Sequence, residues 1–268
     1  MIPYFEVPPL SLGPLEIHAF GALAALGIYV GARLAARMAR TYAPGDDLPI
    51  VEAAPWMVAG GVVGGHLVHV LGYHPEILAR EGFVSLLKVW DGLSSMGGVL
   101  GGLLTLVLFF RAKGWRILPH VNALALGVAP GWGIARLGCF AAHDHRGVLT
   151  DFPLAVAFPG GARHDLGLYE AVILFVISGV LWLLARRPRP EGFLMGVLAL
   201  AYAVPRFFMD FLRATDLPFS DGRIAGLTPA QWTAFLLVGV GAWLLARARH
   251  LPAVDLPRGR EKARTAAA

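Results

Sequence analysis

The sequence predicts an all-α integral membrane protein with about seven transmembrane helices. Hydrophobic residues make up 56% of the 268 residues, charged residues make up only 15%, and the mean hydropathy is +0.62. So few polar side chains cannot cover a water-soluble domain of this length. Apolar runs of about 20 residues, which as helices can cross a hydrocarbon core of about 30 Å, recur along most of the chain. We therefore expect one polytopic transmembrane domain over residues 1–250.

Seven apolar runs are the predicted spans. Glycine is frequent, with 33 residues, as is typical of membrane helices that pack closely through small side chains. The fourth run contains Pro119, Asn122 and Pro130, and we expect a bend at Pro130 because a proline within a helix frees a backbone carbonyl. The predicted spans are residues 17–36, 54–73, 93–110, 118–135, 166–185, 193–211 and 229–246.

Basic residues predict the orientation of these helices, because Lys and Arg beside span ends are retained in the cytoplasm. Fifteen of the 23 Lys and Arg residues follow the first, third, fifth and seventh spans. This pattern predicts that the N-terminus is outside and that residues 251–268 form a basic cytoplasmic tail. No basic segment precedes the first apolar run, so we expect the first span to be retained rather than cleaved as a signal peptide.

The remaining charges are assigned to the outer side of the membrane. The longest outer loop, at about residues 136–165, is expected to form a small outward-facing head region. The formal charge of +5 needs no nucleic-acid partner, since basic residues at cytoplasmic span ends account for it. The outer charges include Arg136, Arg146, Arg163, Arg206, Arg213, Asp144, Asp151, Asp165, Glu170, Asp210 and Asp216.

Four polar residues of the sixth span share one face of a helix. Tyr202, Arg206, Asp210 and Arg213 follow each other at spacings of four, four and three residues. Arg206 lies about 14 residues from the cytoplasmic entry at Gly192, roughly 20 Å at 1.5 Å per residue, in the outer third of the hydrocarbon. A charge at that depth must be paired, reach the interface or line a wet cavity. Pairing with Asp210, one turn away, is the simplest structural explanation.

Arg136, at the outward end of the fourth span, reaches a similar depth from a different helix. Guanidinium groups match phosphate oxygens with two parallel hydrogen bonds. Two arginines that converge at the level of the lipid headgroups therefore predict a site for a phospholipid phosphate. An arginine at a span end also serves as an interfacial anchor, so the prediction depends on the convergence of Arg136 with Arg206.

The outer loop also contains histidines. His143 and His145 flank Asp144, and His164 and Asp165 follow in the same loop, a set of ligands that zinc accepts. No HExxH pattern or cysteine pair accompanies them, and polar loop residues are the simpler explanation, so no metal site is predicted. The lone Cys139 cannot form an intramolecular disulfide, and it is expected to pack inertly rather than act as a nucleophile.

Several motifs, in order along most of the chain, resemble the prolipoprotein diacylglyceryl transferase family of bacterial inner-membrane enzymes. The segment from Arg136 to Gly147 resembles the family's Arg-x-Gly-Asn-Phe-x-Asn-x-Glu-x-x-Gly signature. Each motif alone is weak, but their order and spacing are specific. The others are Glu16-Ile17-His18-Ala19-Phe20-Gly21, Asp91 to Gly98, Arg163-His164, Leu168-Tyr169-Glu170, the stripe from Tyr202 to Asp216, and Gly226 to Gln231.

The resemblance implies a seven-helix enzyme with an outward-facing site in the bacterial cytoplasmic membrane. It would transfer the diacylglyceryl group of phosphatidylglycerol to the lipobox cysteine of prolipoproteins, releasing glycerol 1-phosphate, without a cofactor. Its partners would be phosphatidylglycerol, prolipoprotein signal peptides and membrane lipid. By position, Arg136 and Arg206 would hold phosphate, Tyr202 would support the site, and Asp144 would replace the signature glutamate. The other expected contacts to phosphatidylglycerol are Gly97, Gly98, Asp210 and Arg213.

Met96 departs from the family's pattern. It stands where the family has a histidine thought to act as a base, and a thioether cannot take a proton from the substrate thiol. We hypothesise that His143 or His145, held by Asp144, acts as the base instead, since an unmodified histidine titrates near pH 6.5. Two other functions remain open: a non-catalytic or transport-like protein that binds anionic lipid, and a metal-dependent membrane hydrolase that uses the His-Asp-His loop.

Overall fold

The computed structural model describes residues 1–13, 15–42, 48–217 and 223–253; the side chains of residues 12, 15, 41, 95 and 96 are outside this description. It divides into two compact units, Met1–Gly45 with Val121–Ala268, and Asp46–His120. We describe each unit by itself. Of the predicted tail, residues 254–268 lie outside the described part.

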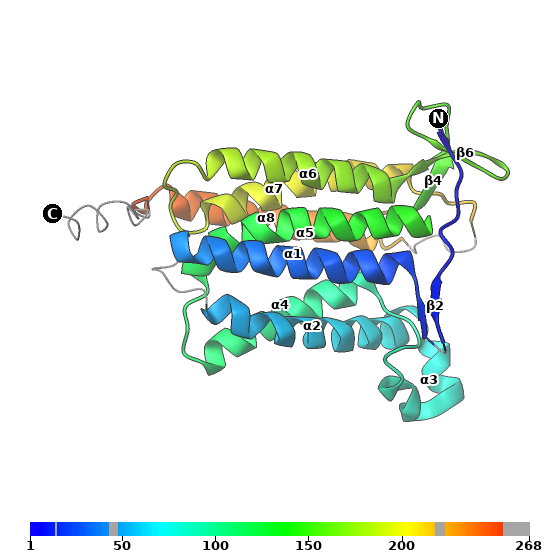
Figure 1. Cartoon of the computed structure of the whole chain (residues 1–268), viewed down its shortest axis with the longest axis horizontal. Coiled ribbons are helices and arrows are strands. Elements are labelled where there is room, and N and C mark those ends of the chain that lie inside the picture. The colour runs from blue at the N-terminus through cyan, green and yellow to red at the C-terminus, as the bar shows by residue number, and fades with distance from the viewer. Residues whose placement is uncertain (14, 43–47, 218–222, 254–268) are drawn as a thin grey trace. The chain divides into compact units, whose positions relative to one another are not determined.

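The first unit is a bundle of five long helices. They are α1 (Ala19–Tyr42), α5 (Val121–Ala142), α6 (Leu166–Leu184), α7 (Phe193–Met209) and α8 (Pro229–Ala248), and they run side by side in Figure 1. Helix α5 contacts α1, α6 and α7, and it is the most buried of the candidate spans in the described residues. Its central place explains why the fourth apolar run carries small and polar residues: most of its surface faces protein rather than lipid.

Helices α1 and α5 approach each other through glycines. A Cβ atom added to Gly131 of α5 would lie 2.5 Å from the carbonyl oxygen of Gly27 and 3.0 Å from the Cα atom of Gly31 in α1. These contacts are with backbone, which cannot rotate out of the way as a side chain can. The glycines therefore set the distance between the two helices.

Replacing Gly131 with alanine should destabilise the protein by about 1–3 kcal/mol, because the added methyl group pushes α1 from α5. The matched control is Gly179→Ala in α6, where an added Cβ has no described atom within 4 Å. Alanine favours a helix over glycine, so this control should be neutral or slightly stabilising. Thermal unfolding of both purified variants in detergent compares them. Equal melting temperatures for the two variants would contradict the prediction.

A small β-sheet forms the head region at one end of the helical bundle (Figure 1). Its strands are β1 (Ile2–Pro3), β4 (Arg146–Leu149), β5 (Val156–Phe158) and β6 (Gly161–Asp165), in the order β1-β5-β6-β4. Strand β1 is parallel to β5, and the other neighbours are antiparallel. A separate hairpin joins β2 (Leu10–Leu12) and β3 (Leu15–Ile17). The head region begins after Ala142, later than the predicted loop, because α5 continues past Arg136.

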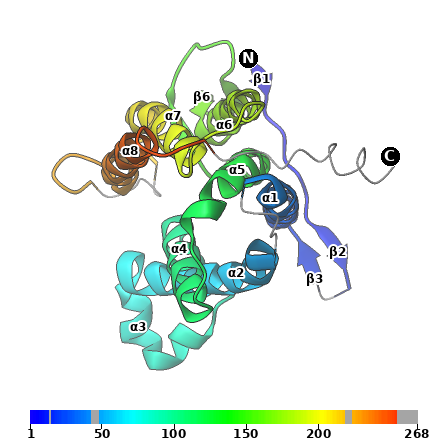
Figure 2. The ribbon, with the colours of Figure 1, turned by 90° about the vertical axis from the view of Figure 1, so that its left-hand side faces the viewer.

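The second unit contains α2 (Leu48–Val68), a π-helical turn (His69–Tyr73), α3 (Pro75–Glu81), a 3-10 turn (Gly82–Leu87), α4 (Ser95–Ala112) and a 3-10 turn (Leu118–His120). Figure 2 shows α2 and α4 side by side, with α3 beside them. A Cβ atom on Gly64 of α2 would lie 2.6 Å from the Gly97 carbonyl oxygen of α4. The buried His66 ring bonds to the carbonyls of Ser85 and Gly92, at 2.8 and 3.1 Å, and so fixes the α2–α4 connection.

The membrane-spanning character predicted from the sequence is confirmed. Six helices of the described residues are long and apolar enough to cross a membrane, and each overlaps one predicted span. The predicted third span corresponds to a shorter apolar helix, Gly97–Ala112. The fourth span begins at Leu118 as predicted but ends later, at Ala142, so Arg136 lies within α5 rather than at its end.

Candidate active site

The two arginines highlighted by the sequence meet at a third residue, Glu170 of α6. The Nε atom of Arg136 lies 2.9 Å from Glu170 Oε1, and the Nε atom of Arg206 lies 3.9 Å from Glu170 Oε2. Both arginines are 8% exposed and Glu170 is 1% exposed. Three helices, α5, α6 and α7, thus each contribute one charged side chain to one buried cluster.

Tyr202 completes this cluster from α7, one turn before Arg206. Its hydroxyl donates a 2.5 Å hydrogen bond to Glu170 Oε1, and its ring lies 4.9 Å from that of Trp132. Trp132, one turn before Arg136, also lies 6.0 Å from the Arg136 guanidinium carbon. The two aromatic rings form an apolar surface beside the charges. Such a surface excludes water, which would weaken the electrostatic interactions of the charges.

Asp210 organises the end of α7. Helix α7 ends at Met209, and the 3-10 turn Asp210–Leu212 follows it. The fully buried Asp210 carboxylate accepts hydrogen bonds from Arg206 Nη1 at 2.5 Å, from Arg213 Nε at 3.3 Å, and from the Thr228 hydroxyl. Thr228 is the N-cap of α8, which it closes in a capping box with Gln231. The predicted Arg206–Asp210 pair is therefore present, and it also fixes where α8 starts.

The arrangement leaves guanidinium donors for an anion. Within the described residues, the polar contacts of Arg136 and Arg206 use Nε and Nη1, and none uses Nη2. Two guanidinium groups with unused Nη2 atoms can bind the oxygens of a phosphate.

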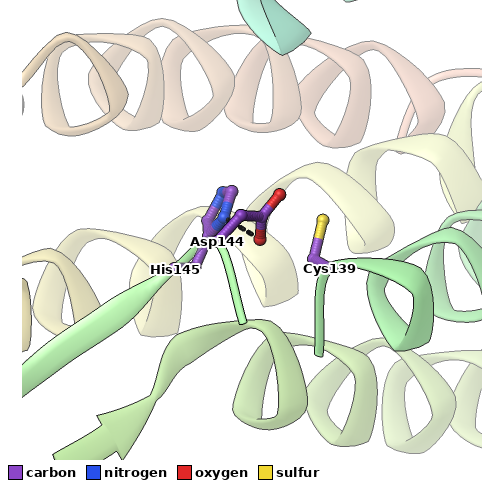
Figure 3. Close-up of side chains that lie close together, drawn as sticks. All are labelled: Cys139, Asp144 and His145. Atoms are coloured by element: carbon purple, nitrogen blue, oxygen red, sulfur yellow. Dashed lines mark hydrogen bonds and ion pairs between the residues drawn. The ribbon is translucent and has the colours of Figure 1, made fainter. Parts of the chain in front are cut away.

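His145 is held between Asp144 and Arg136. Its Nε2 atom lies 3.1 Å from Arg136 Nη1, and its Nδ1 atom lies 2.6 Å from Asp144 Oδ1 (Figure 3). Arginine only donates, so Nε2 accepts that hydrogen bond and Nδ1–H donates to the carboxylate. A neutral histidine with Nε2 free of hydrogen, supported by a carboxylate at Nδ1, is the form that can accept a proton.

His143 has a different environment, although it is only two residues away. It is 4% exposed, with Nδ1 2.9 Å from Asp165 Oδ2 and Nε2 3.1 Å from the Phe5 carbonyl oxygen. The rings of Phe5, Phe140 and Phe158 surround it. Asp144 therefore holds His145, whereas His143 joins the N-terminal segment to the head region.

The His143–Asp165 pair predicts a pH dependence of stability. The Asp165 carboxyl group is fully buried and lies 2.9 Å from His143 Nδ1. Burial raises the pKa of Asp165, although hydrogen bonds from His143 and the Leu168 N–H oppose this effect. Because the folded state then holds the proton more tightly than the unfolded state, stability falls as pH rises above the ordinary aspartate value of about 3.9.

We expect the free energy of unfolding to fall by up to about 1.4 kcal/mol per pH unit as Asp165 ionises. Melting temperatures of the wild-type chain and Asp165→Asn between pH 4 and 7 measure this dependence. The amide of asparagine does not titrate, so the variant should show a smaller slope. The same slope in both proteins would exclude Asp165 as the source.

Three potential metal ligands also lie together here. One ligand atom from each of Cys139, Asp144 and His145 lies within 4.8 Å of the others (Figure 3). However, Arg136 Nη1 lies 3.3 Å from Cys139 Sγ and 3.1 Å from His145 Nε2. A fixed guanidinium thus already occupies the cation position between the sulfur and the imidazole, and His143 faces away toward Asp165. This geometry does not favour the His-Asp-His metal hydrolase.

Comparison with known proteins identifies the family. The family model described as prolipoprotein diacylglyceryl transferase matches residues 9–247. The chain belongs to this family. Proteins named phosphatidylglycerol–prolipoprotein diacylglyceryl transferase from Azotobacter vinelandii and Nitratidesulfovibrio vulgaris are 34% and 32% identical, over 92% and 93% of this chain and 96% and 97% of theirs. The protein of that name from Rhizobium leguminosarum bv. trifolii is 31% identical over 96% of this chain and 97% of its own length.

Membership of the prolipoprotein diacylglyceryl transferase family confirms the resemblance found in the sequence, and with it the prediction of a multi-pass membrane transferase of lipoprotein biosynthesis. The cluster in the first unit contains Arg136, Arg206, Tyr202, Asp210 and Arg213 of the predicted site residues, with Asp144 and His145 beside it.

Two of the predicted site residues belong to the second unit. Gly97 and Gly98 lie in the first turns of α4, where Gly97 packs against α2: an added Cβ would lie 2.6 Å from the Val68 Cβ atom. The Met96 side chain is outside the described part of the structure.

Glu170 was not among the site residues predicted from the sequence, although both arginines form an ion pair with it. From the sequence it was only one of the outer charges and part of a family motif. A carboxylate just inside an apolar run could have indicated the site, as the arginines did, because a charge in the membrane is costly and needs a partner. The identity of its partners depends on α5 and α7 and is not visible in α6 alone.

Proposed function

We propose that this chain transfers the diacylglyceryl group of phosphatidylglycerol to the lipobox cysteine of prolipoproteins, with Arg136 and Arg206 holding the lipid phosphate. One observation supports these roles: two buried guanidinium groups from different helices lie on one carboxylate and keep their Nη2 atoms unused among the described residues. Family membership supports the reaction itself.

The chemistry requires positive charge at the phosphate. The cysteine sulfur forms a bond to the glycerol carbon of the diacylglyceryl group, and the bond from that carbon to the phosphate oxygen breaks. The phosphate changes from a diester with one negative charge to glycerol 1-phosphate, a monoester with up to two. Donors placed where charge develops stabilise the transition state more than the substrate. Arg136 and Arg206 supply such donors in a site largely closed to water.

His145 is the proposed base for the substrate thiol. In the unliganded site its Nε2 atom accepts a hydrogen bond from Arg136 Nη1. A phosphate that takes this Nη1 donor frees Nε2 to accept the thiol proton, while Asp144 stabilises the imidazolium that forms. Lipid binding would therefore precede thiol activation. Tyr202 supports Glu170, and Asp210 supports Arg206.

The proposed topology has seven spans, of which the apolar part of α4, Gly97–Ala112, is the shortest. The N-terminus is outside, and the C-terminus is in the cytoplasm of a bacterial cell. Basic residues beside the ends of α1, α4, α6 and α8 support this orientation. The head region and the arginine cluster then face outward, where the lipobox of a secreted prolipoprotein is available.

A transfer assay tests the function against its two alternatives. Purified chain is mixed with phosphatidylglycerol carrying labelled acyl chains and with a lipobox peptide, with and without a chelator. Transfer of label to the peptide that a chelator does not change is the expected result. Lipid binding without transfer would support a non-catalytic lipid-binding protein, and loss of activity with the chelator would support a metal-dependent enzyme. Rescue of lipoprotein maturation in cells depleted of their own transferase gives an independent readout.

A further inference from the structure

Glu170 is a buried acid whose role the transfer reaction does not explain. It is 1% exposed, and its two oxygens contact Arg136 and Arg206 on their Nε edges while Tyr202 donates a 2.5 Å hydrogen bond to Oε1. A site that only needed to bind phosphate tightly would not place a carboxylate between its two phosphate-binding cations. Glu170 must therefore have a second role that compensates for the phosphate affinity it removes.

Geometry gives the first part of its role. Each guanidinium group is planar, so an anion on the Nε edge fixes the plane and the direction of the remaining donors. Glu170 faces the Nε edge of both arginines, at 2.9 Å from Arg136 and 3.9 Å from Arg206, although they come from different helices. It therefore links the orientations of the two guanidinium groups and of their Nη2 donors, while Asp210 also holds Arg206 through Nη1.

Charge gives the second part. Arg136 and Arg206 each carry one positive charge, which Glu170 opposes from between them and Asp210 opposes at Arg206. The lipid phosphate has a charge of −1, whereas the glycerol 1-phosphate product reaches −2. In a site shielded from water, removal of the Glu170 charge would therefore favour binding of this product over the substrate, and product release would limit turnover.

We infer that Glu170 is a positioning residue that orients the Arg136–Arg206 pair and weakens its hold on glycerol 1-phosphate, so that product leaves the site. This inference rests on the proposed function, because it requires that the two arginines bind phosphate. It goes beyond that function by assigning the control of product release to a residue outside the phosphate contacts.

The test compares Glu170→Gln, Glu170→Asp and Arg163→Lys in the purified full-length chain. Glutamine keeps the shape of the side chain and removes its charge, and aspartate keeps the charge but draws it back from both arginines. Arg163→Lys is the control, because Arg163 pairs with the exposed Asp216 and its charge is kept. Inhibition by sn-glycerol 1-phosphate is measured under multiple turnover, and the rate of label transfer is measured separately with enzyme in excess over peptide.

For Glu170→Gln we expect inhibition by glycerol 1-phosphate to strengthen at least about tenfold, because one unit of opposing charge is lost in a low-dielectric site. Multiple-turnover rate should fall by more than single-turnover rate, with a burst of one product per enzyme. Glu170→Asp should strengthen inhibition by a smaller factor, and Arg163→Lys should leave it within about twofold of wild type.

Unchanged or weaker inhibition in the glutamate variants, with equal losses in the two rates, would overturn the inference and leave Glu170 a structural residue. If Glu170→Gln does not fold, Glu170→Asp decides by the same criterion. A wild-type chain that neither transfers label nor responds to glycerol 1-phosphate would instead refute the proposed function. The two failures are therefore distinguishable.

Discussion

Replacing Arg206 with lysine should lower the rate of diacylglyceryl transfer by about 100-fold or more. Arg206 uses separate nitrogen atoms for Glu170 and for Asp210, and it retains Nη2 for a phosphate oxygen. A lysine ammonium is a single point that cannot reach all three positions from one place. The change keeps the positive charge, so it tests the shape of the donor group rather than the presence of charge.

The matched control for this change is Arg163→Lys. Arg163 forms a two-pronged ion pair with the exposed Asp216 through Nη1 and Nη2, away from the Glu170 cluster. Lysine loses one of the two hydrogen bonds to Asp216, and an exposed ion pair contributes little energy. Transfer should therefore stay within a few-fold of wild type. Initial rates with labelled phosphatidylglycerol compare the two variants. An Arg206→Lys enzyme as active as the control would mean that diffuse positive charge is sufficient.

Replacing His145 with glutamine should lower transfer by about 100-fold or more at neutral pH, since a general base contributes about this much. The Gln side chain can still accept a hydrogen bond from Arg136, so the arginine should stay in place. The measurement is kcat/KM for label transfer at neutral pH.

His164→Gln is the control for the His145 change. His164 also belongs to the head region, where its Nδ1 atom lies 3.0 Å from the Tyr169 hydroxyl and burial lowers its pKa. It has no contact with the arginine cluster in the described residues, so its replacement should leave transfer within a few-fold of wild type. If the double variant His143→Gln with His145→Gln keeps full activity, neither histidine is the base.

The sequence was sufficient to locate the helices because the membrane imposes a strong signal. Each span is a long apolar run, and the rare charges within such runs stand out by their cost. Arg136 and Arg206 could therefore be found without a structure. The end of α5 could not, since residues 136–141 are buried or half-buried in the structure and need not be as apolar as a lipid-facing turn.

The head region and the partners of the charges depend on contacts distant in sequence. Strands of two to five residues are too short to give an alternating pattern, and β1 pairs with a strand more than 150 residues away. His143 and His145 look equivalent in sequence, and only their neighbours distinguish them. One faces Asp165 and the Phe5 carbonyl, and the other faces Asp144 and Arg136.

Pairing of the first strand with a distant one has a consequence for biosynthesis. Ile2 pairs with Val156, and the Ile2 N–H donates to the Ala155 carbonyl, so strand β1 has no partner strand until the residues near 156 have been made. The head region can close only after α5 and the segment that follows it have been synthesised. Strand β1 must therefore stay unpaired while the intervening helices are made.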